Sequence, residues 1–116
     1  MTDTRASHLA ELLHFSRPIA EVARDLSAFG WDSDEDLITL EPIHAFSVLS
    51  RFLAGELSVT DVEEWANAIE CREDIGLDQE SLMASVIFEL ANPLITKPLT
   101  RQSATDLVSK LKEAAT

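Results

Sequence analysis

The sequence contains few of the residues that build small disulfide-rich or turn-rich proteins. Its 116 residues include one cysteine, three glycines, four prolines and no tyrosine. A single cysteine cannot form an internal disulfide, which excludes a disulfide framework and a cysteine-rich metal site and suits a reducing compartment. So few glycines and prolines leave few positions for tight turns, which argues against an all-β sandwich. The sequence therefore favours long regular elements.

Basic residues and long apolar runs are also scarce. Nine Lys and Arg stand against 21 Asp and Glu, a net charge of −12. Residues 32–89 hold 15 of the acids but only Arg51 and Arg72. This negative field repels phosphate backbones, so we expect no binding of nucleic acid. No apolar run approaches the length of a membrane span and no signal peptide is visible, so we expect a cytoplasmic protein without membrane contact.

Hydrophobic residues make up 46% of the chain, which is enough for one core. The length fits one domain, so we expect a single helical domain over residues 1–116. Apolar residues recur at helical spacing in six segments, and no segment reads clearly as a strand, which predicts an all-α bundle of five to six short helices. The predicted inward faces are Leu9, Leu12 and Leu13; Ile19, Val22, Ala23 and Leu26; Ile43, Ala45, Phe46, Val48, Leu49, Phe52 and Leu53; Val62, Trp65, Ala66 and Ile69; Leu82, Met83, Val86, Ile87 and Leu90; and Ala104, Leu107, Val108 and Leu111.

Polar residues before these stripes predict where the helices begin, because Ser, Thr and Asp side chains accept hydrogen bonds from the first free N–H groups. The third helix is apolar around nearly its whole circumference, so we expect it to be central and most buried. Gly55 should end it, and Asn92-Pro93 should end the fifth helix before an extended linker. The expected N-caps are Ser16, Thr39, Ser58, Asp78 and Thr100. Ser58 should form a capping box with Asp61.

The segment WDSDED, residues 31–36, places acids directly after a tryptophan. Its first, third and fifth loop positions match an EF-hand, but the sixth is Leu37 instead of glycine and the twelfth is Ile43 instead of glutamate. A loop without that glycine and bidentate glutamate cannot enclose calcium. We interpret the segment as a solvated surface available to a basic partner, and its acids are Asp32, Asp34, Glu35 and Asp36.

A second acidic cluster lies in EEWANAIECREDIGLD, residues 63–78. Glycosidases also use paired carboxylates, but one of the two sits in a dry pocket, and no aromatic or glycine-rich cleft accompanies these acids. Two interpretations stay open: a solvated helix face with Arg72 at its end, or a surface that recognises a basic partner. The acids in question are Glu63, Glu64, Glu70, Glu73 and Asp74.

The remaining reactive residues predict no cofactor and no metal. His8 and Glu11 share a helix face but supply only two ligands, and the other histidines lie elsewhere. Cys71 stands among acids, which disfavour the thiolate of a nucleophile, so we interpret it as inert. Trp65 belongs to a core stripe. Trp31 either closes the core, which is the default, or stands exposed as an anchor for a partner.

WANAIECREDIGLD, then FELANP, then LT before the last helix form a pattern that resembles small bacterial proteins similar to toxin-immunity proteins. The resemblance covers about residues 16–112. It implies an acidic helical protein that binds a toxin domain stoichiometrically. The immunity proteins of nuclease colicins rely on tyrosines in a short helix. The chain departs from that family because it contains no tyrosine.

These observations lead to one functional hypothesis and two alternatives. The hypothesis is a non-enzymatic acidic domain that binds a basic protein, most specifically an immunity protein neutralising a basic toxin domain. The alternatives are a regulatory or adaptor subunit that binds its partner through a hydrophobic groove, and a small enzyme with an unmarked site. The predicted partner-binding residues are Trp31, Asp32, Asp34, Glu35, Asp36, Glu63, Glu64, Glu70, Glu73 and Asp74.

Overall fold

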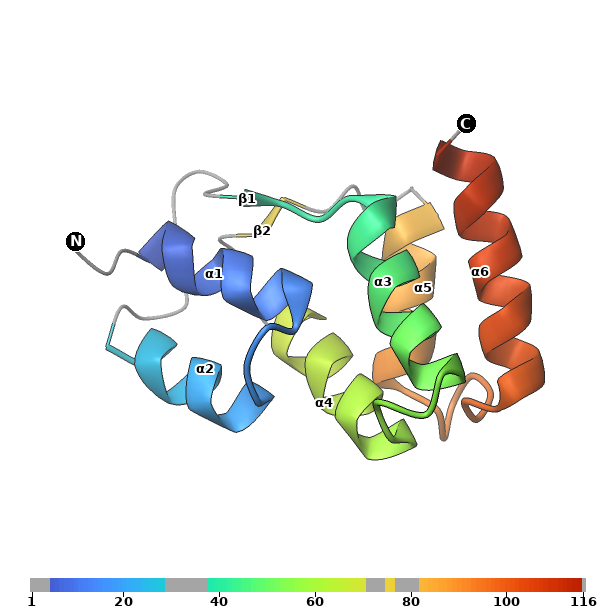
Figure 1. Cartoon of the computed structure of the whole chain (residues 1–116), viewed down its shortest axis with the longest axis horizontal. Coiled ribbons are helices and arrows are strands. Elements are labelled where there is room, and N and C mark those ends of the chain that lie inside the picture. The colour runs from blue at the N-terminus through green and yellow to red at the C-terminus, as the bar shows by residue number, and fades with distance from the viewer. Residues whose placement is uncertain (1–4, 29–37, 71–74, 77–81, 116) are drawn as a thin grey trace.

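The computed structural model describes residues 5–28, 38–70, 75–76 and 82–115, and in these ranges it contains six helices around one apolar core (Figure 1). The prediction of an all-α bundle is therefore confirmed. The molecule measures 40 × 28 × 28 Å along its principal axes. The elements are α1 (Arg5–His14), α2 (Ile19–Leu26), β1 (Ile38–Thr39), α3 (Pro42–Leu53), α4 (Val59–Glu70), β2 (Ile75–Gly76), α5 (Leu82–Ala91) and α6 (Arg101–Ala115).

Helix α4 lies at the centre of the bundle and packs against α1, α2, α3 and α5 (Figure 1). Its apolar stripe is almost completely buried, as the spacing of Val62, Trp65, Ala66 and Ile69 predicts. The indole of Trp65 has no exposed surface, and its Nε1 donates a hydrogen bond to the carbonyl of Leu12 at 2.9 Å. The only polar atom of this large side chain is therefore satisfied inside the core.

The prediction that the third helix is central is wrong, because α4 occupies that place, although Ile43 is the one exposed residue within α3. Helix α3 lies between α1 and α6 (Figure 1). Ile43 is 57% exposed, and Phe46, Phe52 and Leu53 are only partly buried. An apolar circumference shows that a helix can be buried on any side, but the neighbours available decide which sides are covered.

A short parallel sheet, which the sequence did not predict, joins two distant segments. Ile38 pairs with Ile75 and Thr39 with Gly76, and the N–H of Leu40 extends the ladder to the Gly76 carbonyl at 3.0 Å. Each strand has only two residues, which is too short for an alternating apolar pattern to be visible in the sequence. Because Thr39 is in β1, it is not the N-cap of α3, and Glu41 occupies that position instead.

Several predicted helix ends are confirmed. Ser58 and Asp61 form a reciprocal capping box, with backbone-to-side-chain distances of 3.1 and 2.9 Å. The Thr100 hydroxyl accepts the N–H of Ser103 at the start of α6. Gly55 follows α3 with φ +87°, a left-handed conformation that glycine adopts without a Cβ clash. Helix α5 stops at Ala91, before Asn92 and Pro93.

Three local predictions are wrong. Ser16 does not cap α2, because the N-cap of that helix is Pro18. The Ser16 hydroxyl instead donates to the Glu11 carbonyl in the last turn of α1. Ala23 faces solvent, because the buried stripe of α2 consists of Ile19, Val22 and Leu26. The segment after α5 is not extended throughout, since residues 93–95 form a turn. The predicted cap Asp78 lies outside the described residues.

The first turn of α3 depends on a neutral histidine. The backbone N–H of Glu41 donates to Nδ1 of His44 at 2.9 Å, so that nitrogen must be unprotonated. His44 is 7% exposed, and its ring meets the ring of His14 edge-on with centroids 4.8 Å apart. Burial lowers the pKa of His44, the nearby His14 lowers it further, and the Glu41 carboxylate opposes both effects.

This arrangement predicts a loss of stability in mild acid. A histidine whose pKa is lower in the folded state takes up more protons in the unfolded state, so stability falls as the pH drops from about 6.5 toward the folded pKa. Urea unfolding of the wild type between about pH 7.5 and 5.5 should show this loss. His44→Asn keeps an acceptor near the Nδ1 position but does not titrate, and should flatten the dependence. An equal pH dependence in both proteins would contradict the assignment to His44.

Trp65→Phe tests the central contact. The substitution keeps an aromatic ring but removes the N–H and part of the ring volume, so the free energy of unfolding should fall by about 1–3 kcal/mol. Urea titration followed by circular dichroism measures the change. Phe88→Leu is the control, because Phe88 is 48% exposed and its change should stay within about 0.5 kcal/mol. A similar loss in both variants would show that Trp65 is not specially placed.

Candidate interaction site on helix α4

Three of the ten predicted partner-binding residues lie in the described part of the chain, and all three are on α4. Glu64 and Glu70 are exposed, and Glu63 is partly buried. They share one helix because the apolar stripe of α4 faces inward and leaves the remaining positions to solvent. The other predicted residues, Trp31, Asp32, Asp34, Glu35, Asp36, Glu73 and Asp74, lie outside the described residues.

The acids of α4 border the buried stripe on two sides. With about 100° between successive residues, Asp61 and Glu64 fall along one edge of the outward surface, and Glu63 and Glu70 along the other. Each edge meets a different hollow of the molecule. One hollow lies beside the connection between α1 and α2, and the other lies beside the turn after α5. The four carboxylates therefore flank the outer side of α4 and do not form one cluster.

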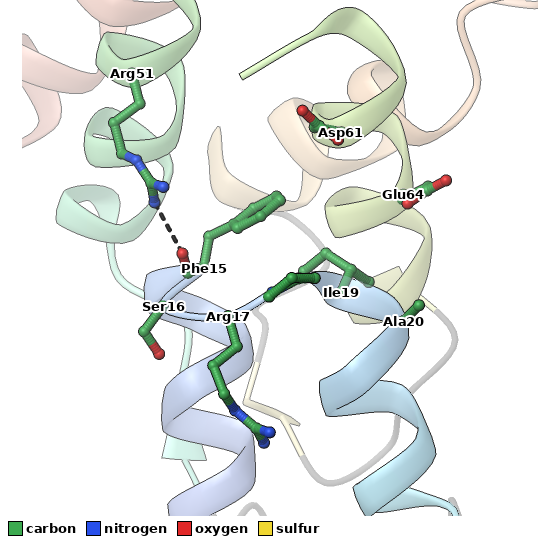
Figure 2. A pocket seen from close by; sticks show the side chains of 9 residues that line it. Phe15, Ser16, Arg17, Ile19, Ala20, Arg51, Asp61 and Glu64 are labelled. Atoms are coloured by element: carbon green, nitrogen blue, oxygen red, sulfur yellow. Dashed lines mark hydrogen bonds between the residues drawn. The ribbon is translucent and has the colours of Figure 1, made fainter. Parts of the chain in front are cut away.

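The first hollow has a volume of about 360 Å³ and is shown in Figure 2. Phe15, Ile19 and their neighbours form its floor, with Arg51 on one side and Glu64 on the opposite side (Figure 2). Arg51 lies over the Phe15 ring, 5.4 Å from its centroid, and Nη1 donates to the Phe15 carbonyl at 2.9 Å. Phe15 has a left-handed backbone with φ +49°, which ends α1. The hydrogen bond from Arg51 to its carbonyl stabilises the chain at this point.

The arginines of this hollow are already neutralised by acids of the chain. Arg17 donates to Glu11 at 2.9 Å and to Asp25 at 2.8 Å, and Arg51 donates to Glu56 at 3.2 Å. The hydrogen bond from Arg17 holds the pKa of the Asp25 carboxyl below its usual range, and the same guanidinium, with His8, lowers the pKa of Glu11. These cations stabilise the link between α1 and α2, so the hollow does not present free positive charge.

Among the carboxylates at the first hollow, Glu64 is the one left for a partner. Asp61 is used in the capping box with Ser58. Glu64 forms no hydrogen bond or ion pair with another described residue and extends to the outside of the hollow (Figure 2). The same absence of a described partner applies to Glu63, one residue earlier on the opposite edge of α4.

The second hollow has a volume of about 310 Å³ and combines Glu63 with an apolar turn. Leu94 is 99% exposed and Ile95 72% exposed, and both line the hollow together with Pro93. Sequence reasoning assigned these residues to a linker. The signal that was available is a pair of large apolar residues between two prolines, outside every helical stripe.

Glu70 has a structural role in holding this turn. Nδ2 of Asn92 donates to the Glu70 carboxylate at 3.1 Å and to the Phe88 carbonyl at 2.9 Å. The amide therefore links the end of α4 to the end of α5. Of the three described acids, Glu63 and Glu64 are thus the ones available for intermolecular pairing.

The described residues contain no group of three His, Cys, Asp or Glu that could hold a metal ion. Within the same residues, no helix has both the length and the apolar content needed to cross a bilayer. The buried histidines are engaged, because Nδ1 of His8 bonds Glu11 at 3.0 Å and Nδ1 of His44 caps α3. The arrangement on α4 therefore offers fixed negative charge next to exposed apolar surface.

Comparison of the chain with known proteins found no matching family model, no matching curated protein and no matching solved structure. A functional proposal therefore starts from the acids of α4 and the adjoining turn.

Proposed function

We propose that the protein is a non-enzymatic domain that binds a basic protein through the outer side of α4. In its most specific form it is an immunity protein that occludes a basic toxin domain. The observation that carries the proposal is that Glu63 and Glu64, on the two edges of the outer side of α4, have no partner among the described residues. A basic surface would supply that partner.

The charge of α4 supports this choice of partner. The helix VTDVEEWANAIE carries four acids and no Lys or Arg, in a chain of net charge −12. Long-range attraction of this kind accelerates the encounter with a basic protein and disfavours acidic ones. In the bound state, carboxylates would pair with Lys or Arg that the toxin domain uses for its own substrate, which blocks that substrate from binding.

A second function, an adaptor that binds through an apolar groove, is favoured by the hollow beside Leu94 and Ile95. Both functions predict a protein partner. They differ in the contribution of charge, since apolar docking alone depends little on salt whereas steering between exposed charges is screened by it.

Charge reversal at α4 distinguishes the two. Incorporation of a photoreactive phenylalanine at Asn67, which is exposed on α4 between the two acidic edges, captures the bound protein in the source cells, and its basic surface can then be verified. Glu63→Lys/Glu64→Lys should slow association with that protein by about tenfold or more at low salt and by less at high salt. Stopped-flow measurements over a range of ionic strength give the association rate constants of the wild type and the variant at low and at high salt.

Asp106→Lys/Glu113→Lys on α6 changes the net charge by the same amount at a different place and is the matched control. A small effect of the control beside a large effect at α4 supports a localised site. Equal association rates for wild type and the α4 variant, or capture of an acidic protein, would refute the proposal. The toxin form requires in addition that co-expression with the captured protein relieve its toxicity.

A further inference from the structure

We infer that the turn at residues 93–95, together with the hollow next to Glu63, is the docking site for a basic amphipathic helix of the partner protein. This inference rests on the proposed function for the basic character of the partner, and it adds the location and the type of segment bound.

Leu94 and Ile95 are the two most exposed large hydrophobic residues among those described, at 99% and 72%. They are adjacent, and they line the same hollow as Pro93 and Ala91. Apolar side chains scattered singly over a surface are ordinary, but a protruding pair beside an open hollow marks a contact site. Removal of these side chains from water is the gain that a partner would realise.

The turn is held in one conformation by hydrogen bonds that leave its apolar side chains outside. The Asn92 carbonyl accepts the N–H groups of Ile95 and Thr96 at 3.2 and 3.1 Å. The Thr96 hydroxyl lies 2.8 Å from the Asn92 carbonyl and 3.0 Å from the Glu89 carbonyl and shares its single proton between them. A preorganised turn loses little conformational entropy on binding, which favours affinity.

The same hydrogen bonds indicate the type of segment that docks. Because the N–H groups of Ile95 and Thr96 are already engaged, this part of the turn cannot add an extended strand by backbone pairing. Recognition must then use side chains. A helix with apolar residues at i, i+3 and i+4 presents a continuous apolar face to Leu94 and Ile95, with flanking cations that reach Glu63.

Charge selects this occupant over the others that an apolar turn can receive. A second copy of the chain carries the same net charge of −12, so the two chains repel each other, and an anionic membrane is repelled in the same way. Glu63 lines the hollow itself and has no partner among the described residues, so a bound Lys or Arg would be paired there. The complementary ligand is therefore both apolar and basic.

A synthetic peptide that repeats Leu-Lys-Lys-Leu-Leu-Lys-Leu, labelled with a fluorophore, is the probe. Its anisotropy with the full chain gives a dissociation constant. Leu94→Ser/Ile95→Ser should weaken binding by about 100-fold or more, because the burial of each of the two large apolar side chains contributes about 10- to 100-fold. Ile43→Ser, which removes a side chain that is 57% exposed on α3, should leave binding unchanged. Both variants should keep the urea midpoint of the wild type.

The result also separates this inference from the proposed function. If Glu63→Lys/Glu64→Lys weakens peptide binding but Leu94→Ser/Ile95→Ser does not, the docking site is wrong and recognition by charge stands. If only the serine variant weakens binding, the apolar site stands and the steering role of the acids fails. Absence of peptide binding would overturn the inference. So would a dimer in sedimentation equilibrium, or binding to phosphatidylcholine–phosphatidylglycerol vesicles, that disappears in the serine variant.

Discussion

The hydrogen bond from Nε1 of Trp65 to the carbonyl of Leu12 joins the middle of α4 to the last turn of α1, and α2, α3 and α5 also pack against α4. A tryptophan with no exposed surface fixes the rotation of its helix, since turning α4 would expose the ring and break the bond. The direction of the acidic side chains is then a consequence of core packing. Glu63 and Glu64 face outward because Val62, Trp65, Ala66 and Ile69 fill the interior.

The described arginines that form close contacts also serve the fold. Arg51 donates to the Phe15 carbonyl at the end of α1, Arg101 donates to the Leu53 carbonyl at the end of α3, and Arg17 bridges Glu11 and Asp25. Cations near the C-terminal end of a helix satisfy free carbonyls and interact favourably with its dipole. Because these positive charges are used between helices, they are not available to the outer side of α4, and the negative charge there is left to an external partner.

Many features determined by neighbouring residues could be predicted from the sequence, and features determined by distant ones could not. The stripes that contain Val62 and Trp65, the Ser58–Asp61 capping box and the turn at Gly55 all depend on positions within a few residues, and all were predicted correctly. The cap at Ser16 and the inward position of Ala23 are local features that were not. The parallel pairing of Ile38 with Ile75 joins residues far apart in the chain, so no local pattern reveals it. The same reason explains why α4 and not α3 is central, and why Thr39 pairs in β1 instead of capping α3.

The candidate site combines local and distant effects. That Glu63, Glu64 and Glu70 lie outside the buried stripe of α4 follows from helical periodicity, but only the fold brings Asn92 to Glu70 and so turns one of the three into a structural link. An apolar pair such as Leu94 and Ile95 has the same sequence signature whether it packs or protrudes. Its exposure is decided by Asn92 and Thr96, whose hydrogen bonds fix the turn with both side chains outside. Since the same asparagine bonds Glu70 and shapes the turn, the edge of α4 that carries Glu63 and Glu70 and the apolar protrusion form one continuous surface.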